Sequence, residues 1–437
     1  MTFLTNRPNR NSVTRRFGAI PSHWVDGRLK NVMKVPVTDG PHTTPEFVAE
    51  GVPFLSVDAI QFGELTFEAT RFVSETDATE FRSKAAPRRG DLLMGKAAST
   101  GKIAQVKTDL RFCIWSPLAL IRIAPQRATP SFIEYLLKST PAQAQIDDFC
   151  TSNTQKNISM ADIQRLSILV PPLDEQRQIA EYLDRETGKI DELITKQEQL
   201  VATLAERRQA VIAQAVTRGL DPTIELRETG VYWLRQIPTH WTVRKFSQAA
   251  SINGGQVDPR DEPFASMTLI APNHIEKMTG RILDTATAGD QGADSGKYLA
   301  REGQVIYSKI RPGLRKAVLA PFDCLCSADM YAISGAKSLL RNRFLHLLLL
   351  SEPFSNFVVD VSARVAIPKV NRESLAGAVL WFPSLEEQDA IVDRTSSSVA
   401  TIDLLVAKAG QVVETLRERR GAFISAAVTG KIDVRGL

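Results

Sequence analysis

Lysine, arginine and amide side chains gather in four segments whose residue types could bind a nucleic acid. They are residues 96–107, 151–159 (TSNTQKNIS), 308–316 (SKIRPGLRK) and 362–373 (SARVAIPKVNRE). Lysine and arginine suit phosphate contacts, whereas asparagine, glutamine and arginine can form paired hydrogen bonds with adenine or guanine. The candidate DNA-binding residues are Lys96, Ser99, Lys102, Asn153, Gln155, Lys156, Asn157, Lys309, Arg311, Arg315, Lys316, Arg364, Lys369 and Asn371. A solvated loop is the alternative for each residue taken singly.

Residue patterns typical of catalysis are absent from the sequence. No lysine follows an aspartate or glutamate by two positions, as a common nuclease site requires, and there is no NPPY-like tetrapeptide for a flipped adenine. GxSxG and GxGxxG are also missing, and GKAASTGKI (95–103) has the wrong spacing for a phosphate-binding loop. The histidines and cysteines form no HxH, HExxH or CxxC pattern. We therefore expect no catalytic residue, metal or cofactor on this chain.

Composition indicates a globular protein with more than one core. The chain has 437 residues, 43% of them hydrophobic and 24% charged, with a formal net charge of +5 and a pI near 9.0. Four cysteines without a disulfide-like or zinc-like spacing fit a reducing compartment. The longest apolar run, FLHLLLL (344–350), is far shorter than the roughly 20 residues that span a bilayer. We expect a cytoplasmic protein that does not enter membranes.

The elements that position the four polar segments come from an internal duplication. IPSHW (20–24) recurs as IPTHW (237–241), and PPLDEQ (171–176) recurs as PSLEEQ (383–388). A shift of 212 positions matches 20 of the 48 residues in 174–221 without a gap, where roughly 3 matches are expected by chance. His23 and His240 occupy equivalent places beside a tryptophan in this repeated cassette, so a structural role is expected for both.

Two long helices of about 44 residues are predicted to follow the variable stretches. Mostly apolar residues recur in steps of 4 and 3, which is typical of a coiled-coil seam, and no proline interrupts either helix. Prolines precede both helices, and Gly219 and Gly430 close them. Arg207 and Arg419 fall on seam positions, where they could fix the register or lie where the seam opens. The predicted seam residues are Ile179, Leu183, Ile190, Leu193, Leu200, Leu204, Ile391, Ile402, Leu405, Val412 and Leu416.

These elements predict an α+β chain with two globular α/β domains separated by two long antiparallel coiled-coil helices and related by a pseudo-twofold repeat. The segments are an N-terminal cassette (1–30), a first variable domain (31–170), helix 1 (171–219), the repeated cassette (220–244), a second variable domain (245–382) and helix 2 (383–437). Because the second cassette follows helix 1, the N-terminal cassette is predicted to pack at the end of helix 2. The exposed helix faces and Tyr182 are candidates for docking a partner.

In order and duplication, these motifs resemble the specificity subunit of type I restriction-modification systems. The resemblance rests on VTDGPHTTPEF (37–47), GVPFLSVDAI (51–60), TQKNIS before PPLDEQ, GGQVDP (254–259), LIAPNHIEKMTGRIL (269–283), and IDEL and ERR in helices that end in AVT. The second half departs from it by having AIPKVNRE in place of TQKNIS.

The resemblance implies that the variable domains are target recognition domains. Each would read half of a bipartite, asymmetric site in double-stranded DNA, while the helices fix the spacing and dock modification (methyltransferase) subunits, expected to number two. S-adenosylmethionine would be bound by the modification subunit, and ATP and Mg²⁺ would serve the restriction subunit. This chain would then be a non-catalytic specificity subunit. A stand-alone bipartite DNA-binding protein without catalytic partners is the alternative, and a self-contained restriction-methylation enzyme is disfavoured by the missing motifs.

Overall fold

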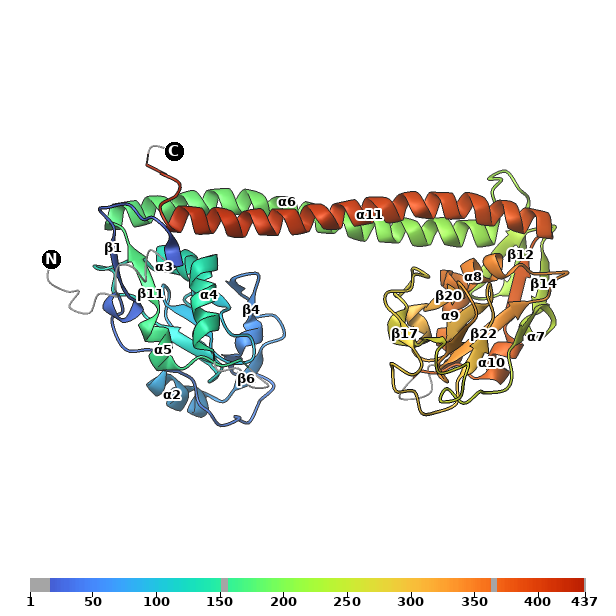
Figure 1. The fold of residues 1–437 in the computed structure, drawn as a ribbon, viewed down its shortest axis with the longest axis horizontal. Coiled ribbons are helices and arrows are strands. Elements are labelled where there is room, and N and C mark those ends of the chain that lie inside the picture. Colours follow the sequence, from blue (N-terminus) through green and yellow to red (C-terminus); the bar gives the residue numbers. More distant parts are fainter. Residues whose placement is uncertain (1–15, 151–155, 363–367, 436–437) are drawn as a thin grey trace. The chain divides into compact units, whose positions relative to one another are not determined.

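A computed structural model describes residues 16–150, 156–362 and 368–435 of the chain. It contains two compact units, one formed by residues 1–197 and 411–437 and the other by residues 198–410. Each unit combines a variable α/β domain with part of both long helices, α6 (Leu173–Arg218) and α11 (Leu385–Val428) (Figure 1). The α+β class and the two long helices agree with the prediction.

The globular part of unit 1 contains a four-stranded sheet in the order β2-β10-β7-β8 and a three-stranded sheet in the order β6-β3-β9. Strands β1 and β11 pair antiparallel, as do β4 and β5. The elements are β1 (Val25–Arg28), β2 (Thr38–Asp39), β3 (Val52–Leu55), β4 (Ile60–Gln61), β5 (Glu64–Leu65), β6 (Arg71–Val73), α2 (Glu75–Lys84), β7 (Leu92–Gly95), β8 (Ile103–Gln105), β9 (Cys113–Ile114), β10 (Leu118–Ile121), α3 (Pro130–Lys138), α4 (Thr140–Phe149), α5 (Met160–Arg165) and β11 (Ser167–Val170).

Unit 2 contains two four-stranded sheets, in the orders β15-β22-β19-β20 and β17-β16-β21-β18. Strand β14 pairs with β23, and β12 and β13 form a hairpin. The elements are β12 (Leu226–Val231), β13 (Leu234–Pro238), β14 (Thr242–Lys245), α7 (Phe246–Ala249), β15 (Ala250–Ile252), β16 (Thr268–Ile270), β17 (Ala286–Thr287), β18 (Tyr298–Ala300), β19 (Val305–Ser308), β20 (Ala317–Leu319), β21 (Cys324–Cys326), β22 (Met330–Gly335), α8 (Asn342–Leu350), α9 (Glu352–Ser362), α10 (Arg372–Gly377) and β23 (Val379–Phe382).

The duplication extends further into the variable domains than the sequence match indicated. The shift of 212 that relates the long helices also relates α3 to α8, α5 to α10 and β11 to β23 at both of their ends. The central sheets have matching strand orders, with β7 between β10 and β8 in unit 1 and β19 between β22 and β20 in unit 2. Sequence similarity has decayed in these domains because many apolar side chains satisfy the same buried position.

The repeated cassette fastens the beginning of each long helix. In unit 1, His23 Nε2 lies 2.8 Å from Glu175 Oε2, and Trp24 Nε1 donates to Glu175 Oε1 at 3.0 Å. The adjacent residue, Gln176, is fully buried, accepts from the Thr129 amide and donates to the Pro171 carbonyl, both at 2.8 Å. The cassette histidine and the DEQ motif are therefore structural partners.

The N-terminal cassette also packs against the end of α11, as predicted. Trp24 shares a hydrophobic core with Ile424 and Val428 near that end. Gly430 has a φ of +72°, and a Cβ atom added there would lie 2.5 Å from Pro21 Cδ. Glycine thus ends α11 because it allows both the left-handed backbone and this close approach.

The inward face of α6 repeats every 3.6 residues, which corrects the predicted seam. Ten steps cover 36 residues along the buried and half-buried positions Ile179, Leu183, Thr187, Ile190, Ile194, Gln197, Val201, Leu204, Arg208, Ile212 and Ala215. The prediction used a 3.5-residue repeat, and a straight helix drifts about 20° per heptad from that repeat. The error therefore accumulates along the helix.

Four predicted seam residues are consequently wrong. Leu193, Leu200, Leu405 and Val412 have exposed fractions of 44–48%. Among the other predicted residues, Ile190 and Leu416 are half-buried, and Ile179, Leu183, Leu204, Ile391 and Ile402 are buried.

An arginine-aspartate pair joins the two helices in each unit, one position away from the predicted arginines. Arg420 Nε donates to Asp191 Oδ1 at 2.8 Å in unit 1, and Arg208 Nε donates to Asp403 Oδ1 at 2.9 Å in unit 2. The two pairs are related by the shift of 212, whereas Arg207 and Arg419 are exposed. Of the two alternatives for Arg207 and Arg419, a role in fixing the register is therefore wrong, and their exposure agrees with positions where the seam opens.

Tyr182 also contacts the neighbouring helix. Its ring centroid lies 5.6 Å from that of Phe423, and the Arg185 guanidinium covers the ring at 5.2 Å. Within unit 1, Tyr182 meets Phe423 and Asp191 meets Arg420, so α6 and α11 run antiparallel there. Tyr182 therefore helps to hold α6 and α11 together.

Within the described part of the chain, no single helix is long and apolar enough to cross a membrane. Helices α8 and α9 pass that test only as a pair bent by 64°. Most of α8 is buried in the core of unit 2.

Candidate nucleic-acid interface

Each variable domain brings two of the predicted polar segments together at one edge of its central sheet. In unit 1, Lys96 directly follows β7, its carbonyl accepts from the Ile158 amide at 2.9 Å, and Ala97 forms a β-bridge with Asn157. In unit 2, Lys309 directly follows β19, and its carbonyl accepts from the Val370 amide at 2.9 Å. We call the paired segments the edge loops: residues 96–107 with 156–159 in unit 1, and residues 308–316 with 368–373 in unit 2.

The edge loops show that residues 368–371 of AIPKVNRE occupy the place of residues 156–159 of TQKNIS. Ile310 forms a β-bridge with Lys369, just as Ala97 does with Asn157. Ser159 caps α5 by accepting from the Asp162 amide, and Asn371 caps α10 by accepting from the Ser374 amide. The segment missing from the second half is therefore present as a structure although its sequence has changed.

The predicted residues of unit 1 differ in their availability. Lys102 and Asn157 are exposed, and Ser99 is half-buried. Lys156 is exposed and its Nζ lies 2.7 Å from Asp147 Oδ1. The Lys96 side chain is only 13% exposed, and its Nζ lies 3.1 Å from Asp39 Oδ2, so Lys96 is held inside the edge loop.

Several predicted residues of unit 2 have partners within the protein. Arg315 Nη1 donates to Gln209 Oε1 of α6 at 3.2 Å, and burial lowers the pKa of its guanidinium. Lys316 Nζ donates to the Pro272 carbonyl at 2.5 Å, and Asn371 is the cap of α10. We therefore correct the prediction for Arg315, whose guanidinium is directed to α6.

Three further predicted residues of unit 2, Lys309, Arg311 and Lys369, lie in its edge loop. Arg311 and Lys369 are exposed, and Lys309 lies 5.8 Å from the centre of the Tyr331 ring. Asn153, Gln155 and Arg364 lie outside the described residues. DNA contact by the edge loops stays a prediction.

Arg372, a member of the fourth predicted polar segment, lies beside two tyrosine rings in unit 2. Its guanidinium lies 5.6 Å from the Tyr298 ring centre and 5.3 Å from that of Tyr331, and Nη2 donates to the Asn253 carbonyl at 2.6 Å. Stacking and hydrogen bonding hold this cation in place. Arg372 stood in a predicted polar segment, but no sequence signal paired it with the two tyrosines.

Sequence reasoning missed Asp39, the ion-pair partner of Lys96 in unit 1, together with the other two partners of Asp39. Asp39 is fully buried and contacts His42, Lys84 and Lys96. Burial alone would raise the pKa of Asp39, but hydrogen bonds and charges from Lys84 and Lys96 keep it below the ordinary value. The four residues are scattered over 58 positions, so no local motif could reveal them.

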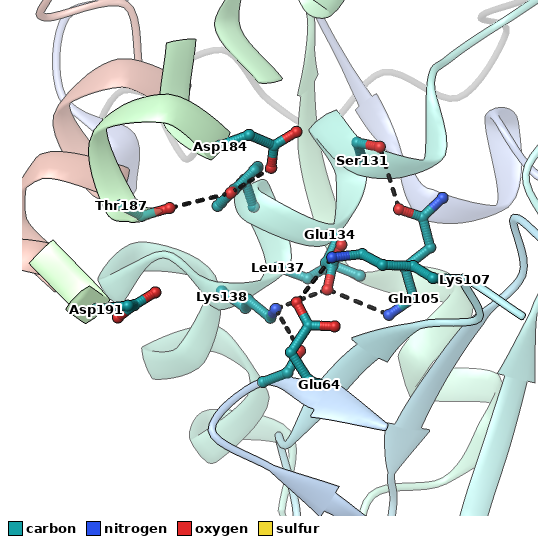
Figure 2. A network of polar contacts seen from close by, with 12 residues as sticks. Glu64, Gln105, Lys107, Ser131, Glu134, Leu137, Lys138, Asp184, Thr187 and Asp191 are labelled. Atoms are coloured by element: carbon teal, nitrogen blue, oxygen red, sulfur yellow. Dashed lines mark hydrogen bonds and ion pairs between the residues drawn. The ribbon is translucent and has the colours of Figure 1, made fainter. Parts of the chain in front are cut away.

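Unit 1 docks its variable domain on α6 through α3. The Tyr135 hydroxyl donates to Asp184 Oδ1 at 2.7 Å and lies 3.3 Å from the Thr187 hydroxyl. On the neighbouring turn, Glu134 and Lys138 form an ion pair at 2.6 Å, and Figure 2 shows this network beside α6. These contacts orient the sheet that carries the edge loop.

Unit 2 docks its variable domain on α6 through a loop and not through the helix equivalent to α3. Arg208 is buried and donates to the Met278 and Thr279 carbonyls at 2.9 and 2.7 Å, besides its contact with Asp403. His346 occupies the position of Glu134 under the shift of 212, and its Nε2 lies 3.1 Å from the Ala317 carbonyl oxygen. Burial lowers the pKa of His346 to about 4.

Among the described residues, no group of three or more His, Cys, Asp or Glu side chains could hold a metal ion. The arrangement at the edge loops offers ammonium, guanidinium and amide groups, which are suited to binding an anionic, hydrogen-bonding polymer.

Comparison with known proteins finds similarity to one family. Residues 21–202 match the model of the type I restriction modification DNA specificity domain. The type I restriction enzyme EcoDI specificity subunit of Escherichia coli is 29% identical over 325 residues, which cover 71% of this chain and 72% of that protein. The putative MjaX specificity subunit of Methanocaldococcus jannaschii is 23% identical and is covered to 96%, as is this chain.

A solved structure shares the fold. A chain from work on complex assembly and conformational transition of the type I R-M system superposes with a TM-score of 0.68 at 17% identity, covering 95% of this chain and all of that one.

Proposed function

The chain belongs to the type I restriction-modification specificity subunits, which recognise DNA sequence, and we propose that each of its edge loops reads one half of a bipartite DNA target. The observation that carries the proposal is a backbone hydrogen bond present in both units. The Ile158 amide donates to the Lys96 carbonyl in unit 1, and the Val370 amide donates to the Lys309 carbonyl in unit 2. It brings exposed cations and an amide to the same edge of two sheets of matching order. Lysine would hold phosphates, and Asn157 and Arg311 would contact bases.

The proposal includes the division of labour within a complex. This chain would be non-catalytic and would bind double-stranded DNA together with modification subunits, two in number, and through the complex with restriction subunits. S-adenosylmethionine, ATP and Mg²⁺ would act on those partners. The absence of catalytic sequence patterns and the specificity-subunit names of the relatives support this division.

Methylome sequencing tests the proposed readers. A host would express the chain with its modification subunit, carrying Asn157→Ala or Lys369→Ala. Asn157→Ala should change or relax the first half of the methylated motif alone, and Lys369→Ala should lower methylation at all sites or alter the second half alone. Lys337→Ala, an exposed lysine outside the edge loops, is the matched control and should leave the motif unchanged. A change in the opposite half would contradict the assignment.

A binding measurement distinguishes the stand-alone alternative. Purified chain without any partner should bind its cognate duplex weakly, and addition of the modification subunit should restore specific binding. Equal specificity and affinity with and without that subunit would favour a stand-alone DNA-binding protein.

A further inference from the structure

Two lysines and a histidine surround Asp39 and form a cluster with more positive than negative charge. Lys84 Nζ lies 2.6 Å from Asp39 Oδ1, while Lys96 Nζ and His42 Nε2 lie 3.1 and 3.0 Å from Oδ2. The two lysines already exceed the single carboxylate by one charge, before any protonation of His42. We call Asp39, His42, Lys84 and Lys96 the Asp39 cluster.

The ratio of two lysines to one carboxylate in the Asp39 cluster differs from that of other ion pairs in the same variable domain. Five carboxylates there each have one cationic partner, in the pairs Arg89–Asp109, Lys107–Glu64, Arg111–Glu75, Arg122–Asp91 and Lys138–Glu134. Residues 31–170 have no net charge, with 15 basic and 15 acidic residues. Within a domain that is neutral as a whole, this cluster therefore has two lysines for one carboxylate.

The carboxylate of the cluster is buried, whereas two of the side chains around it are exposed to solvent. Asp39 is fully buried, and Lys84 Nζ also donates to the Gly40 carbonyl at 3.0 Å. Gly40 fits tightly, because a Cβ atom there would lie 1.7 Å from the Ile114 carbonyl oxygen. By contrast, the side chains of Lys84 and His42 are 49% and 66% exposed. A cluster with a purely structural role would bury all of its side chains. Because Lys84 and His42 are exposed, both can contact a ligand.

We propose that the Asp39 cluster binds a DNA backbone phosphate beside the edge loop of unit 1. Lys84 and His42 contact the phosphate, and Asp39 and Lys96 position them. Lys96 precedes Ala97, whose partner is Asn157, so the phosphate would fix the register of the bases that the edge loop meets. This inference rests on the proposed function, because it takes the ligand to be DNA.

Salt-dependent binding of the intact complex tests the inference. The chain and its modification subunit would be titrated with cognate and scrambled duplexes at several salt concentrations. One phosphate contact contributes about 0.9 to the slope of log K against log salt, or about eightfold in affinity at 0.1 M relative to 1 M. At 0.1 M salt, Lys84→Gln should therefore weaken binding of both duplexes about eightfold. It should also reduce the slope of log K against log salt by about one and leave the methylated motif unchanged.

Arg89→Gln is the matched control, because Arg89 lies outside the four predicted polar segments. Its side chain is 57% exposed and has a one-to-one ion pair with Asp109 at 2.9 Å. Its replacement should change affinity less than twofold. Lys84→Arg keeps the charge and should restore most of the binding lost in Lys84→Gln, which separates a phosphate contact from damage to the fold.

Three results would overturn the inference. They are wild-type affinity and slope in Lys84→Gln, failure of Lys84→Arg to restore binding, and a changed first half-site, which would make Lys84 a base reader. Loss of discrimination between cognate and scrambled duplexes by the wild-type complex would instead refute the proposed function itself.

Discussion

In unit 1, His23 and Trp24 share the carboxylate of Glu175 at 2.8 and 3.0 Å, and in unit 2 His240 and Trp241 share that of Glu387 at 2.8 and 3.1 Å. The edge loops show the opposite relationship. Unit 1 surrounds a buried carboxylate with cations, whereas unit 2 holds Arg372 between tyrosine rings. The cassette contacts have been kept because they set the beginning of a long helix. The edge loops have diverged while their backbone pairing has not.

The docks between variable domain and helix lie between these extremes. The arginine-aspartate pair is repeated, but Arg208 additionally bonds two loop carbonyls. Glu134 with Lys138 in unit 1 is matched in position by His346 in unit 2. The following experiments would break or sharpen this comparison.

The buried glutamines should give the largest and most equal effects. Gln388 accepts from the Arg341 amide at 2.8 Å and donates to the Pro383 and Leu339 carbonyls, and Gln176 accepts from the Thr129 amide and donates to the Pro171 carbonyl. Gln176→Leu or Gln388→Leu leaves buried backbone groups unpaired, so each should destabilise its own unit by about 3 to 4 kcal/mol. Hydrogen exchange of β11 and β23 would measure this, with exposed Gln178→Leu as the control. Clearly unequal losses of stability in the two variants would show that the cassette contacts differ between the two units.

The helix arginines should separate the two units. Arg208→Ala removes a buried guanidinium with three partners and should cost about 3 kcal/mol. Arg420 is 25% exposed at its side chain and pairs with a half-exposed Asp191, so Arg420→Ala should cost less than about 1 kcal/mol. Denaturant unfolding followed by exchange in each unit provides the values. Equal costs would show that the loop carbonyls add nothing.

Acid should weaken unit 2 at a place where unit 1 has no histidine. Burial lowers the pKa of His346 to about 4 in the folded chain, whereas a histidine in the unfolded chain has a pKa near 6.5. Between these two pH values the unfolded chain therefore binds a proton that the folded chain does not bind. Stability from this group is complete above pH 6.5 and should fall by about 2 kcal/mol by pH 5. Exchange of peptides from α8 would report the loss, and His346→Gln should abolish this part of it. An unchanged pH profile in that variant would contradict the assignment.

The corrected seam predicts the smallest effect. Leu193→Gln and Leu405→Gln change exposed positions and should alter unfolding free energy by less than about 0.5 kcal/mol. Leu183→Ala, at a fully buried position, is the comparison and should cost about 3 kcal/mol. Thermal unfolding of the chain would rank the three. A large loss from Leu193→Gln would restore the 3.5-residue seam.

Much of the scaffold could be predicted from the residues alone. The duplication, the two helices, their closing glycines and the packing of Trp24 near the end of α11 follow from repeated motifs and from signals that act within a few residues. The sequence also identified Lys96 and Asn157 as members of two polar segments, but not that a β-bridge joins those segments.

The amino-acid sequence determined the repeat, the element types and the helix ends, because these depend on local preferences and on direct comparison of residues. Tertiary structure decided which face of each helix is buried, since a difference of 0.1 residue per turn accumulates over ten turns. It also decided that Arg208 and Arg420, rather than their neighbours, join the helices. Finally, it assembled Asp39, His42, Lys84 and Lys96, because strand order and helix packing bring together side chains that no sequence spacing connects.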